Sequence, residues 1–298
     1  MNFDNHERGY GTMAKSLIVY FSQGGTTAQV AESIATGLRA AEWQADLCNL
    51  KDKQPPKANG YDLIGIGSPV YYFRPPLNVM DYMESLPDLS GRSSFVFVVH
   101  GTYRGDAGTM MRRTLARKRA REVGYLHCRG ADHFLGYLKQ GYFFSPSSPT
   151  VEELAQAEMF GRELIARLAG QSHAELEEDQ PPAAIYRLER FLVNRWLIRQ
   201  MYSRLFTVDA KKCNACGLCM KLCPTGNITQ DKNEHPVWGR NCLLCLTCEL
   251  KCPKDAITSP VSWPLFTPFM IYNVSHASHD PALEHTKVVH QHGRVQQV

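Results

Sequence analysis

The sequence has little excess charge and no long apolar run. Its formal net charge of +4 over 298 residues is too small to indicate a nucleic-acid partner. No stretch has the length and the uniform apolarity of a membrane-spanning helix. The first twelve residues, MNFDNHERGYGT, contain no apolar core, so we expect no secretory signal. These absences favour a cytoplasmic protein without a transmembrane segment.

Two common phosphate-binding motifs are also missing. The stretch from 20 to 31, YFSQGGTTAQVA, contains no lysine and therefore differs from the G-x4-G-K-[ST] loop of nucleotide hydrolases. It does not match the dinucleotide motif G-x-G-x-x-G either. A turn between a strand and a helix can still bind a phosphate through backbone N–H groups and hydroxyls, which suits a permanently bound monophosphate. The residues expected to form this phosphate loop are Ser22, Gln23, Gly24, Gly25, Thr26 and Thr27, and a purely structural turn is the alternative.

Between residues 14 and 170, short apolar runs alternate with stretches of helical periodicity. The runs SLIVYF, ADLCNL, YDLIGIG, SSFVFVVH and EVGYLHCRG predict five strands. Continuous apolar runs are typical of strands that are buried on both faces. We therefore expect an α/β domain with a doubly wound, five-stranded parallel sheet.

The rest of the chain is divided by composition. Residues 171–205 predict a polar linker followed by a basic amphipathic helix that bridges two domains, although its arginines leave a membrane-surface role open. A second domain is expected at 206–260. Residues 261–298 predict an aromatic strap and a mobile, His-rich tail.

Eight of the ten cysteines form an internal repeat. The segments 213–224 and 242–253 both read C-x2-C-x2-C-x3-C-P, and both continue to an Ile-Thr pair. This clustering predicts metal binding in a reducing compartment rather than disulfides. Two zinc sites are the alternative, but paired C-x2-C units would leave the third cysteine of each run without a use.

The spacing predicts how the cysteines divide between two 4Fe-4S clusters. Three cysteines at two-residue intervals can surround one cubane, and the fourth, beside a proline, reaches the other one. One cluster is expected on Cys213, Cys216, Cys219 and Cys252, and the other on Cys242, Cys245, Cys248 and Cys223. Residues 206–260 resemble the bacterial two-cluster 4Fe-4S ferredoxins, which implies a small α+β fold.

The stretch IVYFSQGGTTAQVAESI resembles the flavodoxin signature of an apolar strand, Ser, a small residue, Thr and a helix. The resemblance implies a flavodoxin-like fold with FMN at the phosphate loop. It also implies that the loops after the third and fourth strands, 67–76 and 100–108, hold the flavin ring. The ring-contacting residues expected are Ser68, Pro69, Val70, Tyr71, Gly101, Thr102, Tyr103 and Gly105, with ordinary packing as the alternative for the tyrosines.

The whole chain resembles the flavodoxin-ferredoxin fusions of anaerobic bacteria and archaea. The resemblance implies an intramolecular electron-transfer protein of anaerobic-type metabolism, with protein redox partners. Whether it is also an enzyme stays open. It could be a flavin-dependent reductase of a small molecule, although we find no nicotinamide-binding motif and no clear general acid beside the flavin loops.

Two binding roles are further alternatives. The first domain could be a flavin-free docking module for the ferredoxin part. The segment 111–122 carries six basic residues against one acid and could bind nucleic acid. It lacks interleaved aromatic residues, so we expect a solvated helix or a docking face instead.

Overall fold

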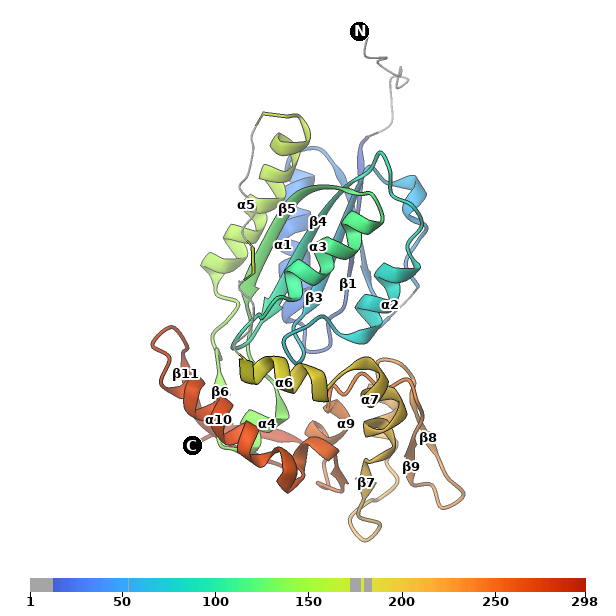
Figure 1. The fold of residues 1–298 in the computed structure, drawn as a ribbon, viewed down its shortest axis with the longest axis vertical. Helices are drawn as coiled ribbons and strands as arrows, with labels where there is room; N and C mark the ends of the chain where they lie inside the picture. Colours follow the sequence, from blue (N-terminus) through green and yellow to red (C-terminus); the bar gives the residue numbers. More distant parts are fainter. Residues whose placement is uncertain (1–12, 53, 172–177, 180–183) are drawn as a thin grey trace.

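The computed structural model describes residues 13–52, 54–171, 178–179 and 184–298. Figure 1 shows two tiers along the long axis: a sheet flanked by helices, called the upper tier, and a smaller lower tier of short elements. Segments from both halves of the sequence contribute to the lower tier.

A parallel sheet of five strands forms the centre of the upper tier. Its strands are β1 (Lys15–Tyr20), β2 (Gln44–Asn49), β3 (Leu63–Pro69), β4 (Ser93–His100) and β5 (Arg121–Arg129). They lie in the order β2-β1-β3-β4-β5, which is the flavodoxin-like order of a doubly wound sheet. β4 is buried along its whole length, as expected for a strand covered on both faces. The predicted fold class of this domain is confirmed.

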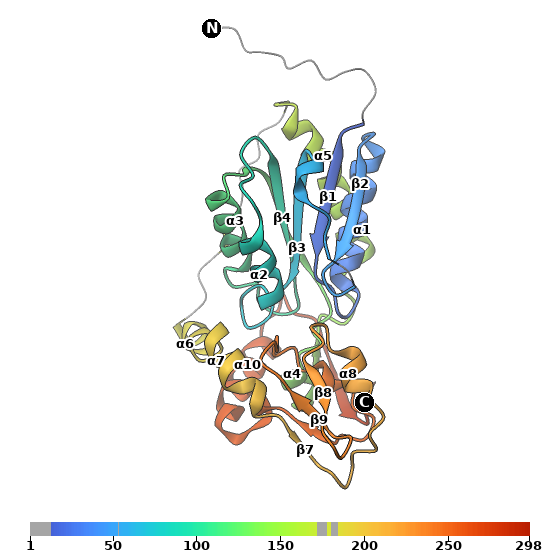
Figure 2. The ribbon, with the colours of Figure 1, turned by 90° about the vertical axis from the view of Figure 1, so that its right-hand side faces the viewer.

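Helices cover both faces of the sheet (Figure 2). α1 (Thr26–Ala40) and α5 (Val151–Leu168) lie on one face, and α2 (Leu77–Ser85) and α3 (Ala107–Arg117) lie on the other. The short helix η1 (Ala58–Gly60) precedes β3. The backbones of α1 and α5 are in close contact. A Cβ atom on Gly37 would lie only 2.0 Å from the Glu158 carbonyl oxygen. This crossing therefore requires glycine.

The lower tier is built from short elements around the cysteine repeat. They are α6 (Ala184–Leu192), α7 (Arg195–Gln200), η2 (Tyr202–Arg204), β7 (Thr207–Val208), α8 (Leu218–Leu222), β8 (Ile228–Gln230), β9 (Pro236–Trp238), α9 (Thr247–Leu250), β10 (Ile257–Thr258), η3 (Pro260–Ser262) and η4 (Pro264–Phe266). β7 pairs with β10 and β8 with β9, both antiparallel. The small α+β domain predicted for the C-terminal half is confirmed.

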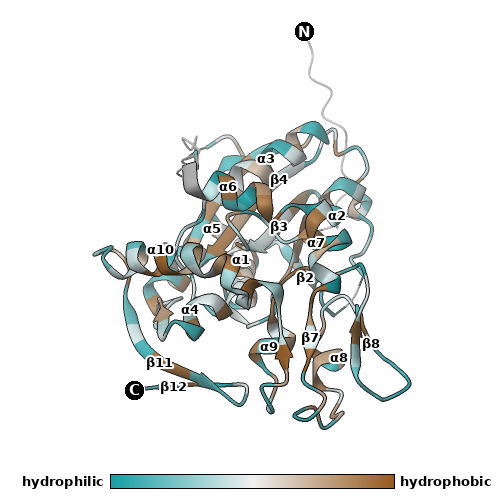
Figure 3. Cartoon of the chain, turned by 60° about the horizontal axis from the view of Figure 1, so that its bottom comes forward, coloured by the Kyte–Doolittle hydropathy of each residue, from teal (hydrophilic) through white to brown (hydrophobic). Residues whose placement is uncertain are grey.

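The predicted bridging helix is two helices. α6 ends at Leu192, and the side chain of Asn194 caps α7 by accepting a hydrogen bond of 3.0 Å from the Leu197 N–H. Hydrophobic and hydrophilic residues alternate along α6 (Figure 3). The helix buries Tyr186 but leaves Phe191 72% exposed. Among the helices in the described ranges, none is both long enough and apolar enough to cross a bilayer.

Two segments tie the tiers together. α4 (Leu135–Lys139) and β6 (Tyr142–Phe144) follow β5 in sequence but lie in the lower tier (Figure 1). There β6 pairs with β11 (His285–Gln291), which forms a hairpin with β12 (Arg294–Gln297).

The structure contradicts the extended strap and the mobile tail predicted for residues 261–298. The aromatic stretch is mostly helical, ending in α10 (Thr267–Ser278), because Pro264 and Pro268 stand in first helical turns, where proline is tolerated. The tail is ordered by strand pairing with β6, a partner so distant in sequence that composition does not reveal it.

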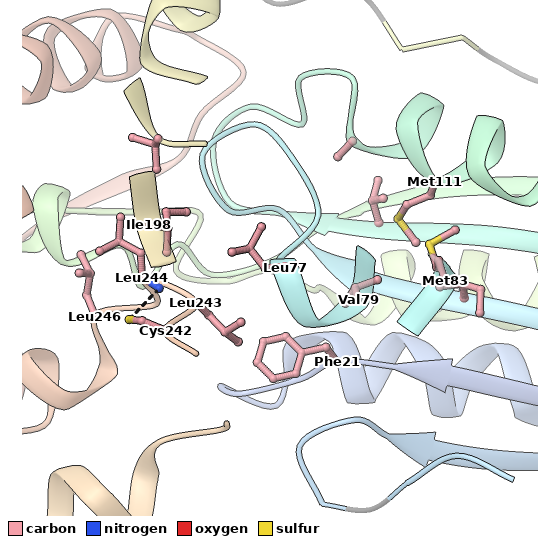
Figure 4. Packing of buried hydrophobic residues seen from close by; sticks show 14 of the residues in the cluster. Phe21, Leu77, Val79, Met83, Met111, Ile198, Cys242, Leu243, Leu244 and Leu246 are labelled. Atoms are coloured by element: carbon pink, nitrogen blue, oxygen red, sulfur yellow. Dashed lines mark hydrogen bonds between the residues drawn. The ribbon is translucent and has the colours of Figure 1, made fainter. Parts of the chain in front are cut away.

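The two tiers share a buried apolar core. Figure 4 shows Phe21 and Leu77 of the upper tier lying toward Leu243 of the lower tier, and all three side chains are buried. Because buried side chains in close-packed cores have little freedom, this shared core fixes the tiers relative to each other.

Candidate functional site

The phosphate loop lies between β1 and α1, at the carboxyl end of the sheet. Gly25 has φ of 101°, a left-handed conformation that favours glycine, and it contributes no side-chain cap to α1. Asn49 of β2 holds the loop by accepting from the Ser22 N–H (3.1 Å) and donating to the Ser22 carbonyl (3.2 Å). Because the Ser22 hydroxyl accepts from the Ala28 N–H, an anion at the start of α1 is left with the N–H groups of Thr26 and Thr27.

A cavity of about 400 Å³ opens beside this loop and extends between the tiers. Its volume lies in the range of sites for small molecules and cofactors. Ten of the fourteen residues predicted to hold a flavin line it: Gln23, Gly24, Thr26, Thr27, Pro69, Val70, Tyr71, Gly101, Thr102 and Tyr103. The structure thus brings together three loops that lie far apart in the sequence.

The other four predicted residues lie outside the cavity wall and have structural contacts instead. Ser22 accepts a hydrogen bond from the Ala28 N–H (3.2 Å), so it stabilises the start of α1. The Ser68 hydroxyl donates to the Pro69 carbonyl (2.8 Å). Gly25 forms the turn itself. Gly105 has φ of 57° and packs so closely on Phe73 that a Cβ atom would lie 2.8 Å from the Phe73 Cβ.

The loop after β3 has an unusual backbone. Tyr72 and Phe73 are consecutive residues with positive φ, 50° and 60°. Such conformations cost about 1–3 kcal/mol each in residues other than glycine and concentrate at ligand sites. The conformation places the Tyr72 hydroxyl 2.9 Å from the Leu244 carbonyl oxygen, to which it donates, and so joins the flavin-loop region to the cysteine repeat.

Several cavity residues were not predicted from the sequence. Asp132 and His133 follow β5, and they could have been found by extending to the fifth strand the rule that ligands lie at the carboxyl ends of strands. Glu189 and Cys245 reach the cavity from the lower tier. No local pattern marks them, because only the docking of the two tiers places them there.

Burial sets the charge of the cavity wall. It lowers the pKa of His100 to about 3, and the Nδ1 of this uncharged ring lies 3.2 Å from the Thr102 carbonyl oxygen. Burial likewise lowers the pKa of His133, with a further contribution from the charge of Lys251. The pKa of Asp132 is raised by burial, against hydrogen bonds from Phe134 and Thr102. The cavity therefore combines a neutral imidazole with a carboxyl that accepts protons more readily than usual.

The cysteines lie in two groups in the structure. The outer group, Cys213, Cys216, Cys219 and Cys252, surrounds a small cavity of about 30 Å³. In the inner group, Cys242, Cys245, Cys248 and Cys223, the thiols lie close enough to influence one another. Burial raises the pKa of Cys242 to about 12, and the charges of Cys245 and Cys223 contribute to this rise. The assignment of the individual ligands stays a prediction.

Backbone N–H groups point at sulfur in both groups. The Asn227 N–H lies 3.3 Å from the Sγ of Cys223, and at the same place in the other repeat the Ala256 N–H lies 3.4 Å from the Sγ of Cys252. Such bonds favour a more negative sulfur. Within the described residues, no three His, Cys, Asp or Glu side chains converge on a single ion position.

The inner group forms part of the flavin-sized cavity. Cys245, Leu244, Thr247, Leu250 and Lys251 line it from below. Gln23 of the phosphate loop donates from Nε2 to the Cys245 Sγ at 3.6 Å, and the Tyr71 hydroxyl donates to the Gln23 Oε1 at 3.2 Å. A cysteine of the repeat thus belongs to the same hydrogen-bonded network as the phosphate loop.

Several basic side chains of segment 111–122 pair with groups of the protein itself. Arg112 pairs with Glu122 and lies over the ring of Tyr125, and Arg119 pairs with Asp88. Lys118 donates to the carbonyl oxygens of Glu84 and Leu86. These contacts favour the solvated helix over a nucleic-acid face, and the absence of a nucleic-acid partner stays a prediction.

Comparisons with known proteins agree with this division. Residues 17–133 match the family model of the flavodoxin domain, and residues 212–257 match that of the 4Fe-4S dicluster domain. The chain joins a flavodoxin domain to a 4Fe-4S dicluster domain. It is an electron-transfer redox protein whose domains bind a flavin and iron-sulfur. No curated protein matches the chain.

Similar solved structures cover about half of this flavodoxin-ferredoxin chain. A flavodoxin from the domain Archaea has 17% identity and a TM-score of 0.42, over 52% of this chain and 99% of its own. Flavodoxin 1 from Bacillus cereus has 20% identity and a TM-score of 0.40, over 51% and 97%. Rubredoxin oxygen:oxidoreductase from Desulfovibrio gigas has 16% identity and a TM-score of 0.39, over 52% and 37%.

Proposed function

We propose that this protein transfers electrons within one chain, between an FMN and two 4Fe-4S clusters. The observation that carries the proposal is the shared cavity, which has the phosphate loop in one wall and Cys245 in another. We assign residues 14–170 to the flavodoxin domain, 171–205 to the linker and bridging helices, and 206–260 to the two-cluster domain, which residues 261–298 follow as a C-terminal segment. The expected cytoplasmic location and anaerobic-type metabolism stay predictions.

The residues of the cavity fit FMN. Gly24, Thr26 and Thr27, at the open start of α1, would hold the phosphate through N–H groups and hydroxyls. Val70 and Tyr71 from one loop and the 101–103 segment from another would hold the ring. Lys251 adds a cation from the lower tier, which the sequence did not predict for this site.

FMN exchanges electrons singly or in pairs, whereas each cubane passes one, so a chain that holds both can convert between the two kinds of exchange. The protein's part is to fix the distance between the sites and to exclude water. The Tyr72–Leu244 and Gln23–Cys245 hydrogen bonds hold the lower tier against the flavin loops. Phe134 and Leu250 line the cavity with apolar surface. No docking step is needed, because both sites belong to one rigid core.

The two cysteine groups then have different roles. The inner group adjoins the cavity and belongs to the core, so we assign it exchange with the flavin. In the outer group, Cys216 is exposed. We assign to this group the exchange with protein redox partners, since a partner can approach it from solvent.

Anaerobic purification with quantitation of iron, sulfide and flavin tests the proposal. We expect about eight irons and eight sulfides per chain, the content of two cubanes, and about one FMN. Clusters without flavin would contradict the proposal and support a docking role for the first domain. Zinc in place of iron would contradict both cluster assignments.

A second candidate function is reduction of a small molecule at the flavin. Asp132 favours it, because its carboxyl lies in the cavity with a pKa raised by burial and could donate a proton to a reduced substrate. This is a general-acid candidate that the sequence did not reveal. An Asp132→Asn variant that loses steady-state substrate reduction, but keeps electron exchange between flavin and clusters, would support this function.

A further inference from the structure

The side chain of Gln23 joins the phosphate loop to the inner cysteine group. Its Nε2 donates to the Cys245 Sγ at 3.6 Å, within the longer range of hydrogen bonds to sulfur. The loop carries Gln23 into the cavity wall beside Cys245 and Tyr71. Because Gln23 and Cys245 are 222 positions apart in the sequence, only the docking of the two tiers creates this contact.

Tyr71 determines which end of the amide faces the sulfur. Its hydroxyl donates to the Gln23 Oε1 at 3.2 Å, so the amide oxygen is occupied and the N–H group is directed to Cys245. The Tyr71 ring packs edge-on against the buried Phe21, with centroids 6.3 Å apart. The orientation of the Gln23 amide is therefore supported by a residue that is itself held by packing.

The two cysteine groups differ in this contact. Each has an equivalent backbone N–H near its fourth cysteine, at Asn227 for the inner group and at Ala256 for the outer group. The inner group has in addition the Gln23 side chain, which comes from the flavodoxin domain. The inner group also lies among buried leucines, which disfavour extra negative charge. A directed N–H donor offsets this penalty locally.

We propose that Gln23 is a positioning residue that raises the reduction potential of the inner cluster selectively. The inference rests on the proposed function and deepens it. Reduction adds one electron and no proton to the site, and the Gln23 N–H stays on nitrogen while its hydrogen bond to the more negative sulfur strengthens. Gln23 thereby increases the share of the electron that the inner cluster holds relative to the outer cluster.

A redox titration of the anaerobic holoprotein, followed by EPR of the reduced clusters, tests the inference. In Gln23→Leu we expect one of two cluster waves to move to lower potential. The ratio of reduced to oxidised cluster at a fixed potential should fall about tenfold, which is about 59 mV for a one-electron couple. The other wave should not move, and it serves as the internal reference.

Further variants separate the hydrogen bond from a general disturbance of the loop. Gln23→Glu keeps the length of the side chain but replaces the N–H donor by a carboxylate, so the same wave should fall at least as far. Tyr71→Phe frees the amide to rotate and should move that wave less. Gln29→Leu, at an exposed position of α1, is the matched control and should move neither wave.

The outcomes distinguish a failure of the role of Gln23 from a failure of the proposed function. Two wild-type waves that stay in place in both Gln23 variants, or that move together, contradict the role of Gln23 alone. A wild-type protein with a single wave and about eight irons has two clusters of equal potential and contradicts the role of Gln23 alone. About four irons per chain contradicts the two-cluster proposal itself. If Gln23→Leu does not retain its iron and flavin, the Gln23→Glu titration decides.

Discussion

The two cysteine runs, 213–223 (the outer run) and 242–252 (the inner run), have similar backbone conformations but differ in how far their side chains are buried. Corresponding positions share left-handed conformations: Ala215 and Leu244 both have φ of 54°, and Gly217 and Leu246 have φ of 70° and 60°. In the outer run the corresponding residues, Asn214, Ala215 and Gly217, are small or polar, and none is buried. In the inner run Leu243, Leu244 and Leu246 are all buried.

This difference shows how a repeat can be specialised without changing its fold. A left-handed conformation costs a leucine about 1–2 kcal/mol relative to glycine. Burying the same side chain stabilises by about 1.5–3 kcal/mol. In the inner run, the stabilisation from burying these leucines therefore offsets the cost of their left-handed backbone. The outer run has a glycine at one of these positions and lies nearer the surface.

A second difference lies one residue after the third cysteine. The outer run has Met220 there, and the inner run has Glu249, whose carboxylate is buried. Glu249 accepts from the Ser259 N–H (2.8 Å) and from the Ser262 hydroxyl (3.1 Å), and it pairs with Lys139 of α4. The inner run is thus joined by polar contacts both to the 259–262 segment and to α4, which comes from the first half of the chain, and Met220 of the outer run cannot form such contacts.

We expect the largest effect when a cysteine of one group is removed and the rate of electron exchange is compared with that after removal of a cysteine of the other group. In Cys245→Ala we expect electron exchange between flavin and clusters to slow by orders of magnitude, because the group beside the cavity is lost. In Cys216→Ala exchange between the flavin and the inner cluster should persist. Flash photoreduction followed at the flavin and cluster absorbance bands measures both rates. Equal losses in the two variants would mean that the groups do not have separate roles.

The next effect concerns the anchor of the inner run. Glu249→Met, which copies the outer residue, should lower the free energy of unfolding by about 2–3 kcal/mol, since buried donors lose their acceptor. Anaerobic denaturant titration of the holoprotein measures this change. Met220→Ala is the matched control, and a loss as large as that of Glu249→Met would contradict the comparison.

A smaller effect separates burial from backbone strain. Leu246→Ala should lower the free energy of unfolding by about 2 kcal/mol, because it leaves a cavity in the shared core. Gly217→Ala should lower it by about 1 kcal/mol, because it puts a Cβ on a left-handed residue. Thermal unfolding of both variants under argon gives the order. The reverse order would show that strain outweighs burial in these runs.

The smallest effect lies across the cavity, at His100. Its pKa is lowered by burial, so the unfolded chain binds a proton that the folded chain does not as pH falls below about 6.5. This contribution to stability is fully present above that pH and is lost progressively below it. At pH 5.5 the loss is about 1 kcal/mol. His100→Asn should unfold with a weaker pH dependence than the wild type between pH 7 and 5.5, and an unchanged pH dependence would contradict the neutral, buried ring.

The features that could be predicted from the sequence are those that depend on residues close together in the chain. Apolar runs predicted the five strands, and cysteine spacing predicted two groups that the structure brings together. The phosphate loop lies where expected, although Ser22 serves the helix rather than the cavity. The lower wall of the cavity could not be predicted, because Cys245 and Glu189 reach it only through domain docking. The hairpin at 285–297 was missed for the same reason, since its partner strand, β6, belongs to the first half of the chain.

The central claim is that flavin and inner cluster exchange electrons within one molecule. Flash photoreduction of the wild-type holoprotein over a wide range of protein concentration tests it most directly. The account predicts a rate of electron redistribution between flavin and cluster bands that does not change with dilution. A rate that falls in proportion to protein concentration would show transfer between molecules and would contradict the account.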